Sequence, residues 1–418
     1  MTNLLLFYCD RMQGFFGLGA HINELITYFK DQRDINITVI LTETDKYSEC
    51  TFVHEGRMNV LYIPSPENGL FVSSEDNMIA HVLTTRILQV AYPYLKNLAN
   101  IVCWFNSIAE LNLARQIKNI IPCKILYVHH GWAWKDRIKV EDNIFAMEWR
   151  KGNTAFCPSA FEGTNSQLEM VNISDITITV TSQANEYFRS AFDIQDDKLR
   201  TIYNGISPPE CRKFDNQTLR RELGIMNGER IILYSGRLTS SKGVYFLIDA
   251  FKSLLSKLPD CRLVLTGTGA LGDILKAAAP TWGKITLTDF VSREWMQKWY
   301  SVADVGILPS LMEQCSYAAI EMMFWKVPLI VSAVDGLEEI FEHGSDCLKI
   351  PVHHDKNGER ILMPLEIEQL LFELLENKQL CEFLTENAYK KALNHFTLCK
   401  MGTGYLELVR TMGESTPK

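Results

Sequence analysis

The first half of the chain alternates short apolar runs with longer amphipathic segments. The short runs are NLLLFYC at residues 3–9, NITVILTE at 36–43, IVCWFN at 101–106, KILYVHH at 124–130 and DITITVT at 175–181. The longer segments are AHINELITYFKDQ at 20–32, IAHVLTTRILQVAYPYLKNL at 79–98 and QANEYFRSAF at 183–192, where Ser182 is a candidate cap. Strands separated by helices predict parallel β-α-β units with both faces covered.

A second series begins after a turn-rich stretch, YNGISPPECRKFDNQ at residues 203–217, which we interpret as a linker. The strand candidates that follow are RIILYSG, CRLVLTG, KITLTDF, VGILPS and VPLIVS, and the clearest helices are VYFLIDAFKSLLSKL and EWMQKWYSVAD. The pattern predicts an α/β chain of two Rossmann-like, doubly wound parallel-sheet domains that face a cleft at the carboxyl ends of their strands.

We therefore expect an N-terminal domain over residues 1–205 and a C-terminal domain over 206–385. Residues 386–418 are helical in pattern and are expected to pack back toward the N-terminal domain. Gly402 and Gly404 predict a bend before the last helix.

Composition narrows the function classes. A chain of 418 residues is too long for one ordinary hydrophobic core, which suggests two domains. A net charge of -8 argues against general binding of nucleic acid or anionic membranes. The 11 cysteines form no C-x-x-C pair, so we expect reduced thiols in the cytoplasm. The short apolar run before Cys9 predicts a first strand rather than a signal peptide. The sequence has no window of roughly 18 apolar residues, so we expect no membrane-spanning helix.

A candidate anion site follows the strand that opens the second series. In LYSGRLTSSKGVYFLIDAF, Gly236 permits a tight turn, Arg237 and Lys242 flank a Thr-Ser-Ser run, and a helix starts near Gly243. A guanidinium, an ammonium and a helix N-terminus together suit a diphosphate. The alternative is a solvated loop with two surface cations.

A glycine pattern follows the next strand. Gly267, Gly269 and Gly272 in LVLTGTGALGDIL have G-x-G-x-x-G spacing. A dinucleotide site requires this motif at the first strand of its domain, whereas at least one strand-helix unit precedes it here. Ordinary turn glycines explain the pattern better.

Two carboxylates flank a third candidate, EQCSYAAIE. Glu313 and Glu321 on one continuous helix would lie about 12 Å apart along its axis. If the helix instead starts near Ser316, Glu313 lies in the preceding loop, and the amides around Cys315 and Tyr317 point between the two acids. This arrangement would suit an extended ligand with a polyol, a phosphate and a ribose. The alternative is an unrelated loop acid and helix-surface acid.

These motifs carry a family resemblance. EQCSYAAIE after ILPS, GRLTSSKG at 236–243 and IYNGI at 202–206 resemble the retaining GT-B glycosyltransferases of family 4, which have a Glu-x7-Glu motif at this place. The likeness covers nearly the whole chain, including QGFFGLGAHINEL, YVHHG and ITVTSQANEYF. It implies a GT-B architecture with an acceptor-side N-terminal domain and a donor-side C-terminal domain.

The resemblance also implies roles for the site residues. Arg237 and Lys242 would hold the nucleotide diphosphate, Glu321 the ribose and Glu313 hydroxyls of the donor sugar. Backbone amides from Cys315 through Ser316 to Tyr317 would contact the sugar and the phosphates. Ser316 stands where the family often has Gly, and it keeps the N–H while adding a hydroxyl that can cap the helix.

Further implied donor contacts come from both domains. The base would lie against backbone groups near Phe290 and Val291, and Asn204 of IYNGI belongs to the donor-binding set. His130 matches a histidine that reaches the donor sugar, with His129 as the competing choice.

In the first loop, Gly17 and Gly19 would let the backbone approach the leaving group beside Phe15 and Phe16. No D-x-D occurs in the sequence, so we expect no metal site, with cationic groups and helix dipoles stabilising the departing diphosphate.

Two aromatic and imidazole clusters have open interpretations. Trp132 and Trp134 could stack on a sugar or peptide, or plug the domain core. His353 and His354 lie in a polar segment, where a solvated loop is a better explanation than a metal site because no third ligand is near.

Together with the sequence, the resemblance implies a cytoplasmic, metal-independent, retaining hexosyltransferase-type enzyme without a cofactor, whose substrate is a UDP- or GDP-linked sugar. The alternatives are a nucleotide-sugar epimerase on the same fold and a catalytically idle nucleotide-sugar-binding module. The acceptor would be a glycan, a lipid-linked glycan or a peptide. The run EQCSYAAIEMM resembles a bacterial subgroup encoded with peptide-modification cassettes, and peripheral membrane contact is compatible with the sequence.

Overall fold

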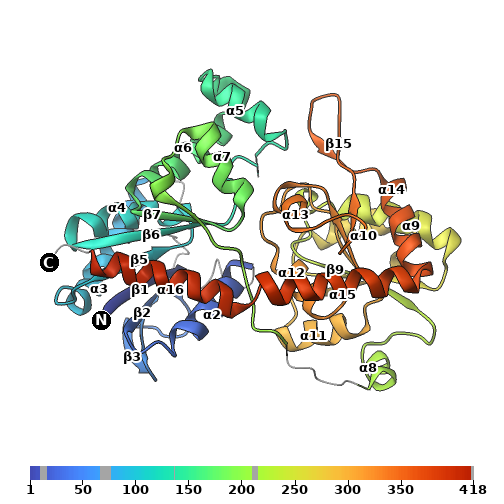
Figure 1. The fold of residues 1–418 in the computed structure, drawn as a ribbon, viewed down its shortest axis with the longest axis horizontal. Coiled ribbons are helices and arrows are strands. Elements are labelled where there is room, and N and C mark those ends of the chain that lie inside the picture. The colour runs from blue at the N-terminus through green and yellow to red at the C-terminus, as the bar shows by residue number, and fades with distance from the viewer. Residues whose placement is uncertain (10–16, 66–76, 136, 210–214, 416–418) are drawn as a thin grey trace. The chain divides into compact units, whose positions relative to one another are not determined.

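The computed structural model of the chain describes residues 1–9, 17–65, 77–135, 137–209 and 215–415 (Figure 1). The chain forms two compact units that do not follow its linear order. Unit 1 comprises Met1–Arg137, Ala146–Gly205 and Leu398–Lys418, and unit 2 comprises Ile138–Phe145 and Ile206–Thr397. Each unit is built on a parallel sheet, as the alternating pattern predicted.

Unit 1 contains an eight-stranded sheet in the order β3-β4-β2-β1-β5-β6-β7-β8. Its strands are β1 (Thr2–Cys9), β2 (Ile35–Thr44), β3 (Thr51–Glu55), β4 (Met58–Pro64), β5 (Ile101–Phe105), β6 (Cys123–His129), β7 (Ile176–Thr179) and β8 (Leu199–Thr201). Every neighbouring pair is parallel except β3 and β4. Central β1 is fully buried from Leu4 to Phe7, because helices cover both faces of the sheet.

The helices of unit 1 connect these strands (Figure 1). They are α2 (Gly17–Phe29), α3 (Asn77–Leu95), η1 (Ile108–Glu110), α4 (Leu111–Ile120), η2 (Thr154–Phe156), α6 (Pro158–Ile173), α7 (Ser182–Phe192), η3 (Asp196–Lys198) and α16 (Leu398–Glu414), while α5 (Asp142–Arg150) crosses from unit 2. The helix α16 is continuous through Gly402 and Gly404, so the predicted bend is wrong. A Cβ at position 402 would lie 2.4 Å from the Tyr28 ring, so Gly402 permits close packing of α16 on α2.

Unit 2 contains a six-stranded parallel sheet in the order β11-β10-β9-β12-β13-β14. Its strands are β9 (Arg230–Ser235), β10 (Cys261–Thr266), β11 (Ile285–Asp289), β12 (Val305–Leu308), β13 (Leu329–Ser332) and β14 (Leu348–Ile350). The strand order reverses between β9 and β12. In open α/β sheets the loops that leave the carboxyl ends of two such strands form the usual place for a ligand.

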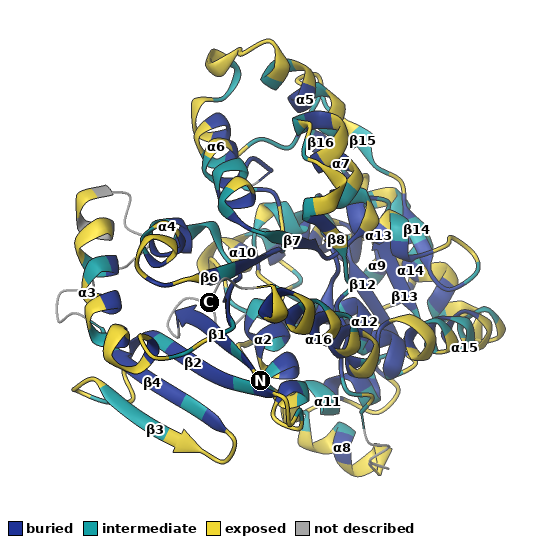
Figure 2. Cartoon of the chain, turned by 60° about the vertical axis from the view of Figure 1, so that its left-hand side comes forward, coloured by how far each residue is buried: buried dark blue, intermediate teal, exposed yellow. Residues whose placement is uncertain are grey.

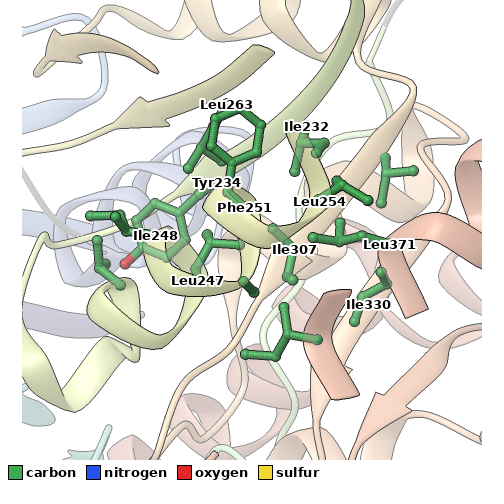
Figure 3. Close-up of a cluster of buried hydrophobic side chains, with 14 of the residues drawn as sticks. Ile232, Tyr234, Leu247, Ile248, Phe251, Leu254, Leu263, Ile307, Ile330 and Leu371 are labelled. Carbon is green, nitrogen blue, oxygen red and sulfur yellow. The ribbon is translucent and has the colours of Figure 1, made fainter. Parts of the chain in front are cut away.

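The helices of unit 2 cover both faces of this sheet. They are α8 (Asn216–Glu222), η4 (Ser240–Lys242), α9 (Val244–Lys257), α10 (Leu271–Ala278), η5 (Trp282–Lys284), α11 (Arg293–Val302), α12 (Tyr317–Phe324), α13 (Asp335–Ile340), α14 (Pro364–Glu376) and α15 (Lys378–His395). One apolar core joins α9, α10 and α14 to the sheet, with Phe251 and Leu254 of α9 and Leu371 of α14 fully buried (Figure 3). Because the chain changes direction across the sheet after β11, right-handed crossovers place α11 and α12 on the opposite face.

A two-stranded antiparallel hairpin, β15 (His353–His354) and β16 (Arg360–Ile361), follows β14. The two histidines therefore lie in a short hairpin rather than in a loop, while their side chains stay solvated, at 43% and 39% exposed. His353 Nε2 lies 2.9 Å from Glu366 Oε2, and His354 Nε2 lies 2.7 Å from Glu141 Oε1. The pairing holds both imidazoles in structured positions.

Other local predictions fail for identifiable reasons. The cap of α7 is Thr181, whose side chain accepts from Ala184 N–H, rather than Ser182. The β3–β4 hairpin was not predicted, because β3 is an edge strand that is intermediate or exposed along its whole length and lacks a strong apolar signal (Figure 2). In the described parts of the chain, no helix combines the length and apolar character needed to cross a bilayer.

Candidate active site

Several predicted site residues lie at the carboxyl edge of the unit 2 sheet. The loop after β9 carries exposed Arg237, whose carbonyl accepts a 2.6 Å hydrogen bond from the buried Tyr234 hydroxyl. Lys242 ends η4 in the same loop. Gly243 follows with φ of 68°, and a Cβ there would lie 1.8 Å from the carbonyl oxygen of Pro309. Only glycine allows the loops after β9 and β12 to approach this closely.

Lys242 and Glu313 form an ion pair across these two loops. The Lys242 Nζ to Glu313 Oε2 distance is 2.7 Å, and the side chains are 16% and 20% exposed. Lys242 Nζ also lies 3.4 Å from the carbonyl oxygen of Met312. An ammonium has three donors, so one remains for another anionic group such as a phosphate oxygen. The two residues that the sequence assigned to phosphate and sugar are thus brought into direct contact.

The helix after Glu313 begins where the sequence predicted. Ser316 is the N-cap of α12, and its hydroxyl accepts from Ala319 N–H at 3.3 Å. Glu313 therefore lies in the preceding loop and Glu321 in the second turn. The buried backbone of residues 315–317 forms the helix N-terminus, where amide N–H groups and the helix dipole favour negative charge.

Glu321 has a partner that sequence reasoning missed. The buried Tyr300 hydroxyl on α11 donates to Glu321 Oε2 at 2.6 Å. Burial raises the pKa of Tyr300, and the negative charge of Glu321 raises it further, so the phenol stays protonated and keeps donating. The only sequence signal was a tyrosine at the apolar face of EWMQKWYSVAD, which also fits a core residue.

The loops after β10 and β11 complete this edge. Phe290 is 49% exposed and Val291 is partly exposed between the end of β11 and the start of α11. At Gly267, where φ is 130°, a Cβ would lie 2.0 Å from the Gly236 carbonyl oxygen. Gly267 and Gly269 therefore permit close packing of the loops after β9 and β10, as turn glycines, whereas Gly272 lies in α10 with open space beside it.

The two candidate histidines of unit 1 differ in exposure. His129 is fully buried, and its Nδ1 lies 2.9 Å from Gln167 Nε2. His130 keeps part of its surface, and its Nε2 lies 3.3 Å from Asn106 Oδ1. Burial lowers the pKa of each imidazole to about 3, so both are neutral near pH 7. Exposure favours His130 over His129 as a ligand contact.

His21 links the predicted unit 1 residues. Its ring lies edge-on to His130 with centroids 4.6 Å apart, and its Nδ1 lies 3.1 Å from Asn204 Oδ1. Burial, with a smaller contribution from His130, holds the pKa of His21 well below its usual range. Asn204 is itself buried, so the structure places it in a neutral polar cluster rather than on an open surface.

Gly17 and Gly19, which the sequence assigned to the first loop, lie in α2, the helix that also carries His21. Gly17 is the exposed first residue of α2, and Gly19 is buried in its first turn. Phe15 and Phe16 lie outside the described residues. Trp132 and Trp134 are 3% and 0% exposed, and both rings pack against Tyr187, so both are core residues of unit 1.

Within the described ranges, no group of three or more His, Cys, Asp and Glu side chains is arranged to hold a metal ion. The ten cysteines in those ranges form no disulfide with one another.

Known proteins resemble both the sequence and the fold. Residues 229–362 match the model of the family Glycosyl transferases group 1. An uncharacterized glycosyltransferase of Methanocaldococcus jannaschii is 36% identical over 176 residues, which cover 40% of this chain and 44% of that protein. The chain spans about half the length of the first curated relatives that it matches.

Solved structures match over nearly the whole chain. Sucrose-phosphate synthase from Thermosynechococcus elongatus superposes with a TM-score of 0.75 at 15% identity, covering 99% of this chain and 100% of that one. Anabaena HepE in complex with UDP-glucose gives a TM-score of 0.71 at 16% identity, covering 98% and 100%. The chain therefore has the two-sheet GT-B fold, and its residues 229–362 match the glycosyl transferases of group 1.

Proposed function

We propose that the chain is a glycosyltransferase that moves a sugar from a nucleotide-sugar donor to an acceptor with retention of configuration. The observation that carries the proposal is the pairing of Lys242 with Glu313 at the carboxyl edge of the unit 2 sheet, with Glu321 one helical turn beyond the N-cap of α12. Lys242 and the N-terminus of α12 match the phosphates of one extended ligand, Glu313 matches its sugar and Glu321 its ribose.

The chemistry follows from these groups. The bond between the anomeric carbon and the diphosphate oxygen breaks, and the acceptor oxygen bonds to the same face of that carbon. The acceptor proton passes to the departing phosphate oxygen. Arg237 and Lys242 stabilise the negative charge that develops on the diphosphate, and Glu313 accepts hydrogen bonds from sugar hydroxyls.

The two carboxylates act differently because they hold different parts of the donor. Glu321 accepts from ribose hydroxyls, and Tyr300 fixes its orientation through the 2.6 Å hydrogen bond. Phe290 and Val291 provide the surface for the base. His130, neutral because burial lowers its pKa, is suited to hydrogen bonding with an uncharged sugar hydroxyl.

The proposal includes metal independence, since the sequence has no D-x-D and two cations are available for the leaving group. The donor is proposed to be a UDP- or GDP-linked sugar, and UDP-glucose is the first to test because HepE was solved with it. A glycan, lipid-linked glycan or peptide is the proposed acceptor, and the cytoplasm the proposed compartment.

Turnover of donors tests this function. The purified chain is incubated with UDP- and GDP-sugars in a strong chelator, with and without candidate acceptors, and released nucleoside diphosphate is quantified. We expect slow donor hydrolysis, faster release with the correct acceptor, and a product that keeps the donor's anomeric configuration by NMR. Epimerised donor without release would favour the epimerase, and binding without any turnover would favour the idle module.

A further inference from the structure

Arg360 of the β15–β16 hairpin lies among three carboxylates. Its side chain is 7% exposed, with Nε 3.2 Å from Glu141 Oε1 and Nη1 2.9 Å from Asp335 Oδ1. Nη2 lies 3.5 Å from Asp142 Oδ1. Burial alone would lower the pKa of Arg360, but Asp335 and Glu141 outweigh it and raise that pKa. The guanidinium is thus a fixed positive charge, since a buried charge is tolerated only when paired.

The same group holds the loop that carries Glu313. Arg360 Nη1 also donates to the carbonyl oxygen of Leu311 at 3.1 Å. Asp335 Oδ2 accepts from Glu313 N–H at 3.3 Å, and Gly336 N–H donates to the Glu313 carbonyl at 3.0 Å. Both backbone groups of Glu313 are therefore tied to residues 335–336, and Asp335 is tied to Arg360.

Asp335 adopts an unfavourable backbone conformation to do this. Its φ is 42°, in the left-handed region that L-residues rarely adopt, and its side chain is 1% exposed. A strained backbone and a buried carboxylate both cost free energy, and each persists only when the surroundings fix it. Here the conformation directs one carboxylate oxygen to Arg360 and the other to Glu313.

The far side of the guanidinium is held by residues 138–145. This segment belongs to unit 2 although it precedes the linker by some way in the sequence. Arg360 N–H donates to the Lys139 carbonyl at 2.8 Å, and Glu141 also contacts His354 of the hairpin. The charge of Arg360 is therefore fixed from two directions, by residues 138–145 and by Asp335.

We propose that Arg360 and Asp335 are positioning residues that hold Glu313 in the geometry required for sugar transfer. In this role Arg360 and Asp335 act through Glu313. The catalytic consequence rests on the proposed function, while the effect on the Glu313 loop does not. If Arg360 and Asp335 served only stability, substituting them would lower stability and nucleotide binding alike. If they position Glu313, substituting them lowers kcat selectively, because small displacements of a reacting group slow the chemical step.

Three variants and a matched control separate these roles. Arg360→Lys keeps a charge but loses the planar fork that reaches Leu311, Asp335 and Glu141 together. Asp335→Gly fits the positive φ but removes the carboxylate, and Asp335→Asn keeps an acceptor for Glu313 N–H. The control is Arg262→Lys, because Arg262 forms a comparable pair with buried Glu229, with Nε–Oε2 and Nη2–Oε1 distances of 3.0 Å, at the amino edge of the same sheet.

The measurements are kcat with a nucleotide sugar, calorimetric Kd for the free nucleoside diphosphate, thermal stability, and hydrogen exchange in peptides covering residues 311–316. We expect Arg360→Lys and Asp335→Gly to lower kcat about 10- to 100-fold with Kd changed less than about threefold. Asp335→Asn should lose less. Exchange in 311–316 should accelerate in the order of the kcat losses, and Arg262→Lys should lower stability without either effect.

The proposal is overturned if exchange at 311–316 in Arg360→Lys and Asp335→Gly matches the wild type. It is also overturned if kcat and nucleotide affinity fall in parallel, or if Arg262→Lys reproduces the kcat loss. A wild type that turns over no nucleotide sugar would contradict the proposed function instead. In that case unchanged exchange still refutes the claim that Arg360 and Asp335 hold the loop that carries Glu313, and accelerated exchange supports that claim.

Discussion

The two units share a strand order but carry different chemistry at their polar sites. Strands β4-β2-β1-β5-β6-β7 of unit 1 and β11-β10-β9-β12-β13-β14 of unit 2 follow the same doubly wound arrangement. In unit 1 the clustered groups are His21, His130 and Asn204, which are neutral. In unit 2 they are Lys242 and Glu313, which form an ion pair. The fold fixes where polar groups gather, and the side chains decide what they can bind.

Burial explains the difference in charge. His21 and His129 are fully buried, and burial is the largest cause that lowers their pKa values. Lys242 keeps a carboxylate at 2.7 Å, which compensates for its partial loss of solvent. Neutral imidazoles suit uncharged hydroxyls, whereas a paired ammonium suits a phosphate.

The largest effect should come from removing the ammonium. Lys242→Ala should lower turnover about 100-fold or more, because a charge-stabilising donor at the leaving diphosphate is lost. Steady-state release of nucleoside diphosphate measures it. The control is Lys257→Ala, which removes another ion-paired lysine of the same unit, on the far end of α9. Equal rates for Lys242→Ala and wild type would refute the phosphate role.

The two carboxylates should separate in a kcat and KM comparison. Glu321→Gln weakens a contact made equally in ground and transition states, so the donor KM and the Kd for free nucleoside diphosphate should rise about 10-fold. Glu313→Gln should lower kcat more than it weakens the free nucleotide, which has no sugar. If Glu313→Gln instead loses nucleotide affinity while Glu321→Gln keeps it, the two assignments are reversed.

Acid should destabilise the histidine cluster through proton linkage. Because burial lowers the pKa of His129 from 6.5 to about 3, the unfolded chain binds a proton that the native chain does not between those values. Stability from this group is complete above pH 6.5 and is lost as pH falls, by at most about 1.4 kcal/mol per pH unit. His129→Phe, which fits beside Trp132 and Phe188, should make the fall in unfolding free energy from pH 7 to 5 shallower.

Glu110 provides a control of opposite sign. Burial raises its pKa from 4.5 to about 8, although the backbone N–H groups of Asn106 and Ser107 oppose the shift. The native chain then binds the extra proton, so stability from this group is complete below pH 4.5 and declines as pH rises toward 8. Glu110→Gln should remove that decline in denaturant titrations. A pH dependence of unfolding that neither variant changes would contradict the assignment of neutral, buried groups in unit 1.

The smallest expected effects compare two tyrosine hydrogen bonds. Tyr300 donates to the carboxylate of Glu321 at 2.6 Å, whereas Tyr405 contacts neutral His21 Nε2 at 3.2 Å. Tyr300→Phe should weaken nucleoside diphosphate binding about 10-fold, since a hydrogen bond to a charged group is worth roughly 1.5–3 kcal/mol. Tyr405→Phe should cost about 1 kcal/mol of stability. Equal effects of the two variants on nucleotide affinity would remove the distinction between the units.

Local patterns in the sequence predicted much of the fold and part of the site. Apolar runs marked β1, β2, β9 and β12, because strands buried on both faces need continuous apolar residues. The start of α12 at Ser316 was predictable because a capping serine precedes an apolar helix. That start also placed Glu313 in the loop before the helix and Glu321 in its second turn.

Long-range contacts could not be predicted in this way. Arg360 contacts Glu141 across 219 positions, and nothing in residues 138–145 indicates that they belong to unit 2. Gly402 looked like a helix bend because its partner, the Tyr28 ring, lies 374 positions earlier and is invisible to a local pattern. The positive φ of Asp335 was not predicted either, and the Arg360 and Glu313 groups that its carboxylate contacts lie 25 and 22 positions away.

The central claim is that the carboxyl edge of the unit 2 sheet binds a nucleoside diphosphate sugar through Arg237 and Lys242. Isothermal titration of the wild type and of Arg237→Ala/Lys242→Ala with UDP, GDP, ADP and TDP and their glucose conjugates tests it directly. We predict that one base series binds the wild type at a single site and that the double variant binds it at least 10-fold more weakly, since each charged hydrogen bond contributes about 1.5 kcal/mol or more. Failure of every nucleotide to bind, or equal affinity of wild type and double variant, would contradict the account.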